Sequence, residues 1–306
     1  MIELKKEELM KNRGYSATLS AGYHLLADNF KAIFRHTWVY VLLLSICLAA
    51  YTSLSVELKE DTLITIIIAA FITMLASLVT DVLFYSRVTT LLNDQSERWN
   101  IGRISKLLGV WILLAIIIGL VIVGVFVMGM GSADALSAAA NEEEMMAQPD
   151  NGTLLLKTLA VGTAICLLAL VLVFPFVYTI MKYLIEPERR LFSTLFGCYG
   201  RGLRYWGYIF VCELLLCLCI GIFSLILCLP MYLVQTVQAL DQSGIIGGDE
   251  SGLPGWFGWL NFGVSVATYF VYSFISLIEF FVAYYIYGSI ETRISERLQL
   301  TAPEEL

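Results

Sequence analysis

The sequence predicts an all-α, polytopic membrane protein, a bundle of six transmembrane helices with an interfacial amphipathic helix. Hydrophobic residues make up 58% of the 306 residues and charged residues only 15%, whereas soluble domains carry about 25% charge. The mean hydropathy is +0.78, and six apolar stretches reach the ~20 residues that a helix needs to cross a hydrocarbon core. These stretches are apolar on every side, which excludes the alternating strands of a closed β-barrel.

The six predicted spans divide the chain into three regions. The spans comprise residues 38–55, 63–92, 107–130, 154–184, 206–236 and 262–290. Residues 1–36 are then a cytosolic or interfacial segment, residues 37–290 the transmembrane domain, and residues 291–306 a cytosolic tail. Within the first region, residues 19–36 carry apolar side chains at helical spacing, which predicts an interfacial amphipathic helix. A cytosolic helix packed on the bundle has the same pattern.

The distribution of lysine and arginine predicts the orientation of the spans. Of the 19 Lys and Arg residues, 17 flank one side of the predicted membrane region, and only Lys59 and Lys157 flank the other. Because loops rich in Lys and Arg stay in the cytoplasm, we expect both termini to be cytoplasmic. The protein is then a multi-pass protein of the cell's inner membrane, N-in and C-in. Its basic face suits anionic headgroups, because each nearby cation contributes about 1 kcal/mol of attraction.

The stretch "GCYGRGLRYWGY", residues 197–208, concentrates glycine, arginine and aromatic residues. It lacks the G-x-G-x-x-G order and the strand–helix context of a nucleotide-binding loop. We interpret its glycines as sites of a bend or a close helix contact. Arg201 and Arg204, together with Arg35, are candidate contacts for lipid headgroups. Membrane lipids are therefore the expected partners, a second copy of the chain and other membrane proteins are further candidates, and no nucleic acid is expected.

The inventory of reactive residues favours a non-enzymatic protein. His24 and His36 are the only histidines, and the seven cysteines contain no C-x-x-C motif, so neither a metal centre nor a redox centre is expected. No nucleophile–base pair is visible in the sequence. We therefore expect no cofactor, no metal and no catalytic residue.

Three acidic residues fall inside the predicted spans, each on a stripe of small and polar residues at helical spacing. An ionised acid near a helix centre costs roughly 2.5 to 3.5 kcal/mol on insertion scales, so the three must be neutralised, paired or hydrated. Two cations at similar depth are candidate partners. The predicted polar cluster comprises Asp81, Arg87, Lys182, Glu213, Tyr272, Ser276 and Glu279.

Two interpretations of this polar cluster remain open. In the first, which we favour, the cluster is structural: small residues let helices approach, and the acids bond to hydroxyl groups or pair with Arg87 and Lys182. In the second, the cluster lines a polar cavity open to the cytosol that holds a substrate or relays protons. The second interpretation makes the protein a small-molecule or proton-coupled transporter.

Two segments, "DNFKAIFRHTWVYVLLLSICLA" and "LFGCYGRGLRYWGYIFVCELLL", share a basic amphipathic part that turns into a Trp-led span. Over residues 18–295 this pattern resembles poorly characterised bacterial six-span membrane proteins, which are similar to the membrane domain attached to some glycerophosphodiester phosphodiesterases. No soluble segment is long enough for the catalytic domain, so the resemblance transfers no active-site residue. It implies a non-enzymatic inner-membrane protein that interacts with lipid or supports an envelope process. A transporter and an intramembrane enzyme acting on lipid are the alternatives.

Overall fold

Helices account for nearly all of the computed structural model, which describes residues 4–56, 63–140, 151–246 and 252–301. No strand occurs among these residues. The helices are α1 (Tyr15–Val56), α2 (Leu63–Asn93), α3 (Glu97–Ala140), α4 (Asn151–Ile185), α5 (Leu191–Gly197), α6 (Tyr199–Arg204), α7 (Trp206–Ile246) and α8 (Phe257–Thr301). The predicted all-α class is confirmed.

The lengths and composition of the helices match a membrane protein. In the described part of the chain, α1, α2, α3, α7 and α8 are long and apolar enough to cross a membrane. Helix α4 runs over 35 residues, and its described apolar part is Val171–Ile185. Each predicted span lies within one of these six helices. The protein is therefore an integral membrane protein with several spans.

Several helices extend well beyond the apolar runs that predicted them. Helix α1 joins the predicted amphipathic helix and the first span without a break, so the predicted boundary at residue 36 lies inside it. Helix α8 likewise continues past residue 290 to Thr301. The division into three regions stays a prediction, and Lys59 lies outside the described residues.

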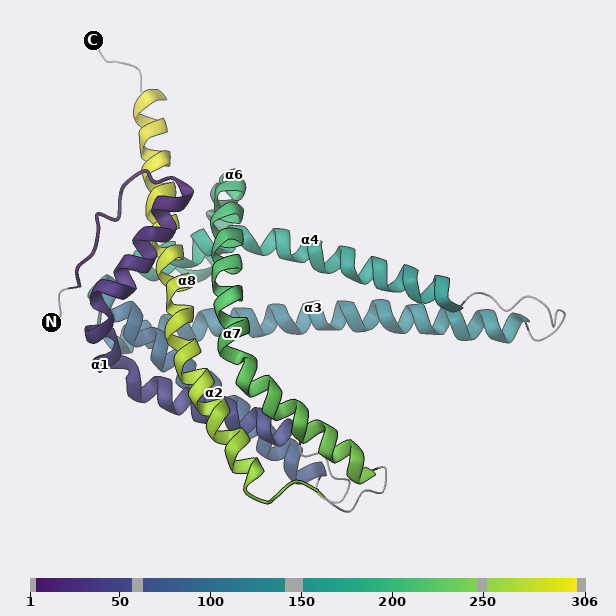
Figure 1. Ribbon diagram of the computed structural model, residues 1–306. Helices are drawn as coiled ribbons and strands as arrows, with labels where there is room; N and C mark the ends of the chain where they lie inside the picture. Colours follow the sequence, from purple (N-terminus) through teal and green to yellow (C-terminus); the bar gives the residue numbers. More distant parts are fainter. Residues whose placement is uncertain (1–3, 57–62, 141–150, 247–251, 302–306) are drawn as a thin grey trace, which may run out of the picture.

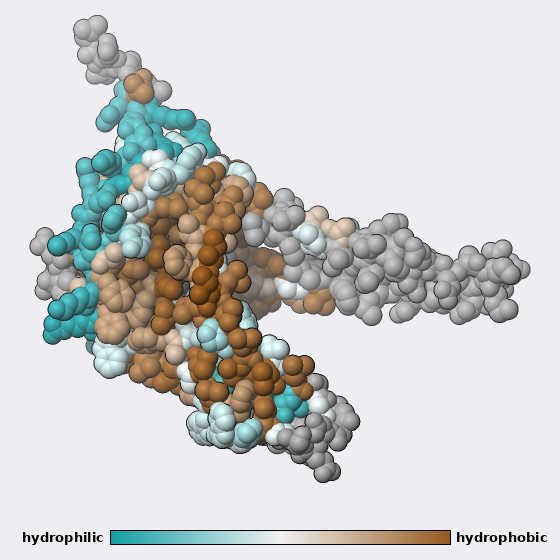
Figure 2. Space-filling model, viewed as in Figure 1, coloured by the Kyte–Doolittle hydropathy of each residue, from teal (hydrophilic) through white to brown (hydrophobic). Residues whose placement is uncertain are grey.

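The helices form two groups that share one end of the molecule (Figure 1). Helices α1, α2, α7 and α8 run together as one bundle, whereas α3 and α4 leave it side by side as a separate pair. The shared end carries residues 4–14, the short helices α5 and α6, and the C-terminal part of α8. We call it the basic end. Figure 2 shows hydrophilic residues gathered there and hydrophobic residues along the helices.

Helix α8 is the central element of the core near the basic end. Every residue from 281 to 290 is buried, because α1, α4, α7 and the N-terminal segment all pack around this stretch. Away from this core, large apolar side chains face outward; Ile64 is 75% exposed and Leu225 is 71% exposed. Such a surface suits contact with lipid tails rather than water.

The first half of α1 packs directly on α8. A Cβ atom on Gly22 would lie 2.5 Å from Cγ2 of Val282, so only glycine permits this approach. The Phe30 and Phe274 rings meet edge to face with centroids 5.6 Å apart. Tyr23 and Phe30 nevertheless remain 55% and 44% exposed. This segment therefore combines the two arrangements that the sequence left open: one face packs on the bundle, and apolar rings remain on its surface.

A proline in α4 anchors the entry into α7. Pro175 lies inside the helix and has no N–H to donate to the carbonyl of Val171, four residues earlier. The indole Nε1 of Trp206 donates to that carbonyl at 3.0 Å. A Cβ atom on Gly202 would lie 2.7 Å from the Pro175 carbonyl oxygen. The predicted close helix contact is therefore confirmed at Gly202, whereas a Cβ atom on Gly197, Gly200 or Gly207 would meet no atom within 4 Å.

Candidate functional site

Two of the three intramembrane acids meet in one small cavity of about 280 Å³, which we call the carboxylate pocket. Glu213 comes from α7 and Glu279 from α8, and Ser276 lies one turn before Glu279. Residues from α2, α3 and α4 complete the lining, so the pocket lies where both helix groups meet. Its lining consists of Tyr85, Trp111, Val177, Ile180, Met181, Glu213, Ser276, Glu279, Phe280 and Ala283.

Asp81 and Tyr272, two further members of the predicted polar cluster, lie beside this pocket. Asp81 is one helical turn before Tyr85 on α2 and acts electrostatically on the Tyr85 hydroxyl. Tyr272 lies two turns before Glu279 on α8 and is 38% exposed. Neither side chain lines the carboxylate pocket. The fold therefore brings together Glu213, Ser276 and Glu279, with Asp81 and Tyr272 at the periphery.

The two cations of the predicted cluster have other partners. Arg87 Nε lies 2.7 Å from Oε1 of Glu97 at the start of α3, and its guanidinium group lies over the Tyr40 ring at 5.6 Å. Lys182 pairs with Glu186 and Glu291. Within the described residues, neither cation is within ion-pair distance of an intramembrane acid. The expected pairing is replaced by pairs with acids outside the predicted spans, namely Glu97, Glu186 and Glu291.

Lys182 is the centre of a buried network between α4 and α8. Its side chain is 2% exposed, and its ammonium group lies 5.7 Å from the centre of the Tyr178 ring. Glu291 Oε1 accepts hydrogen bonds from Lys182 and from the Tyr178 hydroxyl, the latter at 2.5 Å. These bonds compensate the cost of removing both charges from water. The network therefore fixes α4 against α8 at the basic end.

Glu186 extends this network to the connection after α4. The Lys182 Nζ lies 3.1 Å from Oε1 of Glu186. Arg189 Nε donates to Oε2 of Glu186 at 2.7 Å, and the Tyr287 hydroxyl donates to Oε1 at 2.9 Å. Burial alone raises the pKa of Glu186, but the hydrogen bonds from Arg189, Lys182 and Tyr287 outweigh it, so the pKa lies below its usual range. Glu186 therefore stays ionised at neutral pH.

Two of the three predicted headgroup contacts line a single cavity at the basic end, of about 440 Å³, which we call the basic cavity. Arg201 and Arg204 both belong to its lining. Arg35 does not; it lies exposed on α1. The lining consists of Lys182, Glu186, Arg189, Arg201, Arg204, Tyr205, Glu291, Ile294, Ser295 and Leu298. Its four cations exceed its two carboxylates, so the cavity suits an anion.

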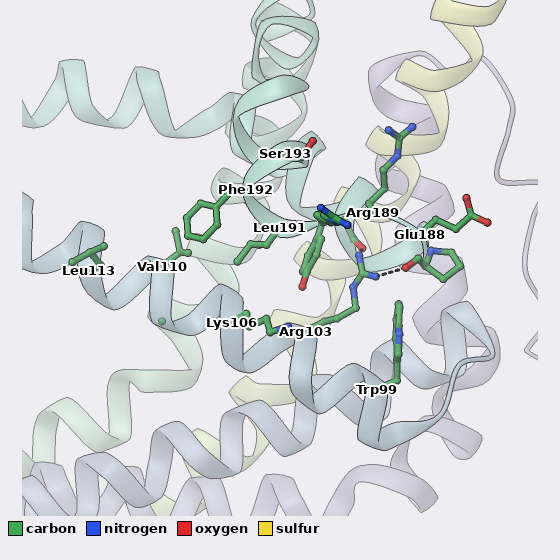
Figure 3. A pocket seen from close by; sticks show the side chains of 14 residues that line it. Trp99, Arg103, Lys106, Val110, Leu113, Glu188, Arg189, Leu191, Phe192 and Ser193 are labelled. Atoms are coloured by element: carbon green, nitrogen blue, oxygen red, sulfur yellow. Dashed lines mark hydrogen bonds between the residues drawn. The ribbon is translucent and has the colours of Figure 1, made fainter.

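A larger depression of about 910 Å³ lies between α3 and the connection from α4 to α5, and we call it the basic groove. Figure 3 shows charged side chains toward one end of it and apolar side chains toward the other. The lining consists of Trp99, Arg103, Lys106, Gly109, Val110, Leu113, Tyr183, Pro187, Glu188, Arg189, Arg190, Leu191, Phe192 and Ser193. The sequence analysis assigned its cations to a basic face that suits anionic headgroups, but it did not predict that they line one groove.

A helical repeat in α3 marks this groove in the sequence. Trp99, Arg103, Lys106, Val110 and Leu113 follow one another at intervals of four, three, four and three residues. This spacing places them on one face of a helix. The polar members precede the apolar ones along that face, as expected for a helix that leaves the membrane interface and enters the hydrocarbon region.

Arg103 is held rigidly at the polar end of the basic groove. It is 6% exposed, and its guanidinium carbon lies 4.2 Å from the Trp99 ring centre and 3.8 Å from that of Tyr183. It donates to the carbonyls of Tyr183, Glu186 and Pro187, the last at 2.9 Å. Its buried Nε has no hydrogen-bond partner.

The comparisons with known proteins do not assign the chain to a family. No family model, curated protein or solved structure matches it. Function must therefore be argued from the chemistry of the three cavities. Among the described residues, no group of three or more His, Cys, Asp or Glu side chains is placed to hold a metal ion. The lining of the basic cavity carries an excess of cations, and that of the carboxylate pocket carries two acids without a Lys or Arg.

Proposed function

We propose that this protein is a non-enzymatic membrane protein of the bacterial inner membrane whose basic end binds anionic lipid. The basic cavity carries this proposal, because it gathers Arg189, Arg201 and Arg204 around a space of about 440 Å³. Arginine forms bidentate hydrogen bonds with phosphate. The excess of Lys and Arg at this end supports a cytoplasmic location for both termini. The similarity to the membrane domain of glycerophosphodiester phosphodiesterases remains part of the proposal.

Charge compensation inside the basic cavity leaves Arg201 and Arg204 available for a ligand. Lys182 is occupied by Glu186 and Glu291, and Arg189 is bonded to Glu186. Arg201 and Arg204 have exposed side chains in the last turn of α6. Cations there also interact favourably with the C-terminal end of the helix. The positive charge that a lipid phosphate meets is thus concentrated on Arg201 and Arg204.

Native mass spectrometry of the full chain tests this proposal. Released from mild detergent with equal amounts of phosphatidylglycerol and phosphatidylcholine, the wild-type protein is expected to retain more of the anionic lipid. The variant Arg201→Gln/Arg204→Gln is expected to lose part of that preference. Arg98→Gln/Lys31→Gln removes the same charge from exposed positions outside both cavities and serves as the control. Equal retention of both lipids by the wild type would refute selective binding of anionic lipid at the basic end.

The carboxylate pocket favours a second candidate function, transport of a proton or a small cationic substrate. Two carboxylates from different helices line a cavity whose lining contains no Lys or Arg. Unpaired acids inside a membrane are a common feature of proton relays and ion pathways. The pocket also lies where the two helix groups diverge, a place where relative movement of the groups would open or close it.

Flux into proteoliposomes tests the transport candidate. With a pH-sensitive dye inside the vesicles and an imposed pH gradient, a transporter gives a wild-type flux that Glu213→Gln/Glu279→Gln abolishes. Asp28→Asn removes an exposed carboxylate from α1 and is expected to leave the flux unchanged. Melting temperatures of all variants establish that they fold. A wild-type rate equal to that of empty vesicles would eliminate proton transport.

A further inference from the structure

We propose that the basic groove binds one anionic diacyl phospholipid, with its phosphate on the cations of α3 and of the α4–α5 connection. The acyl chains then lie against Val110, Leu113 and Phe192. This inference rests on the proposed function and names a defined site for it, distinct from the basic cavity. The basic groove is built from α3, whereas no α3 residue lines the basic cavity.

The polar end of the groove carries a strong excess of positive charge. Arg103, Lys106, Arg189 and Arg190 line it, and Glu188 is the single acidic residue among the lining residues. Lys106 and Arg190 are exposed, so they reach a ligand without losing a protein partner. Arg189 shares its charge with Glu186 through a 2.7 Å hydrogen bond. Such a lining suits the phosphate of a lipid headgroup.

Arg103 supplies a donor that no protein group uses. Its side chain is more than nine-tenths buried, and the Trp99 and Tyr183 rings hold its guanidinium plane. Three backbone carbonyls accept from its terminal nitrogens, while the buried Nε has no partner. A buried donor without a partner costs free energy. Because the two rings and the three carbonyls hold it in place, Arg103 contributes a fixed positive charge at the polar end of the groove.

The other end of the groove suits hydrocarbon. Leu113 is 59% exposed and Phe192 is 63% exposed, and Figure 3 shows both beyond the charged side chains, on the same side as Val110. Gly109 widens the groove, since a Cβ atom built on it would meet no atom within 4 Å. A free phosphate ion would leave this apolar half empty. A diacyl lipid fills both halves, because its charged head and apolar tails follow the same order along α3.

Lipid counting by native mass spectrometry tests the charged half of the site. The probes are phosphatidylglycerol, phosphatidylcholine, and phosphatidylglycerol with millimolar inorganic phosphate as competitor. We expect Lys106→Gln/Arg190→Gln to lower the affinity of the most tightly held phosphatidylglycerol by about tenfold or more, since each headgroup cation contributes about 1 kcal/mol. The control Arg98→Gln/Lys31→Gln removes two exposed cations outside the groove and is expected to change this affinity much less.

A steric variant tests the apolar half without altering charge. Gly109→Trp fills open space in the groove, whereas Gly119→Trp fills open space elsewhere on the same helix. Both substitutions replace glycine within a helix by a better helix former, so both proteins are expected to fold. We expect Gly109→Trp to displace the tightly held phosphatidylglycerol and Gly119→Trp to retain it.

The outcomes separate this inference from the proposed function. If the wild type prefers phosphatidylglycerol but neither groove variant differs from its control, the groove is not the site, although lipid binding at the basic end stands. If the wild type shows no preference at all, both ideas fail. Displacement of the lipid by inorganic phosphate alone would overturn the role assigned to the acyl chains. Resistance to phosphate together with sensitivity to Gly109→Trp supports a diacyl lipid.

Discussion

Trp206 donates its indole N–H to the backbone carbonyl of Val171, 3.0 Å away. This carbonyl lacks its usual helical donor because Pro175 occupies the position four residues later. The first residue of α7 thus satisfies a backbone group that α4 leaves free. This bond therefore links α4 to the start of α7.

A double-mutant cycle tests this relationship. Trp206→Phe is expected to lower the free energy of unfolding by about 1 kcal/mol, because the Val171 carbonyl loses its donor. In the Pro175→Ala background the alanine N–H is available to that carbonyl, so the same substitution should cost clearly less. SDS titration in mixed micelles measures both values. Equal costs in the two backgrounds would show that the indole bond does not compensate the proline.

Gly22 is expected to be intolerant of any side chain. In Gly22→Ala the new Cβ meets both the side chain and the backbone nitrogen of Val282, the latter at 2.9 Å. Because backbone atoms cannot shift easily, α1 must move away from α8, which should lower the free energy of unfolding by about 1 to 3 kcal/mol. Gly102→Ala, on α3, adds a Cβ in open space and should be neutral or slightly stabilising. Thermal unfolding in detergent compares the two variants.

Removing Lys182 should destabilise the protein strongly. Lys182→Ala leaves Glu291 without its cation inside the α4–α8 interface, and loss of one member of a buried pair costs about 3 to 5 kcal/mol. Arg189→Gln breaks the more exposed pair with Glu186, which should cost at most about 1 kcal/mol. The free energies of unfolding from SDS titration give both numbers. Similar losses for the two variants would argue against a central role for Lys182.

Stability should decline in acid partly through Glu186. The pKa of this carboxyl is lowered in the folded protein, against the effect of burial, by hydrogen bonds from Arg189, Lys182 and Tyr287. The contribution of ionised Glu186 to the stability of the folded protein is therefore fully present above the ordinary carboxyl pKa of about 4.3. The contribution is lost as the pH falls through the lower, folded-state value. Melting temperatures between neutral pH and about pH 3 should fall less steeply for Glu186→Gln than for Glu188→Gln.

Reporter fusions test the predicted orientation. Alkaline phosphatase, which is active only outside the cytoplasm, is expected to be active when fused after Val56 at the end of α1. It should be inactive when fused after Leu306, because 17 of the 19 Lys and Arg residues flank the side that carries both termini. The reverse pattern would invert the proposed topology and place the basic groove on the outer face.

Local sequence information was sufficient to predict the spans but not to predict which residues their polar side chains contact. The apolar runs predicted where helices lie, since a helix in hydrocarbon must satisfy its own backbone. The acids Glu213 and Glu279 were recognised because charge inside such a run is rare. The partners of Lys182 were not recognised. Glu291 lies 109 residues further along the chain, and only the packing of α4 against α8 brings Glu291 near Lys182.

By itself, therefore, the sequence determined that this is an all-α membrane protein, because hydropathy and helical spacing are properties of neighbouring residues. Tertiary structure decided which polar groups meet. It separated Arg87 and Lys182 from the intramembrane acids and placed Glu213 and Glu279 in the lining of one pocket. It also placed the cations of α3 in the lining of a groove, because α4 and the α4–α5 connection pack beside α3 and accept hydrogen bonds from Arg103.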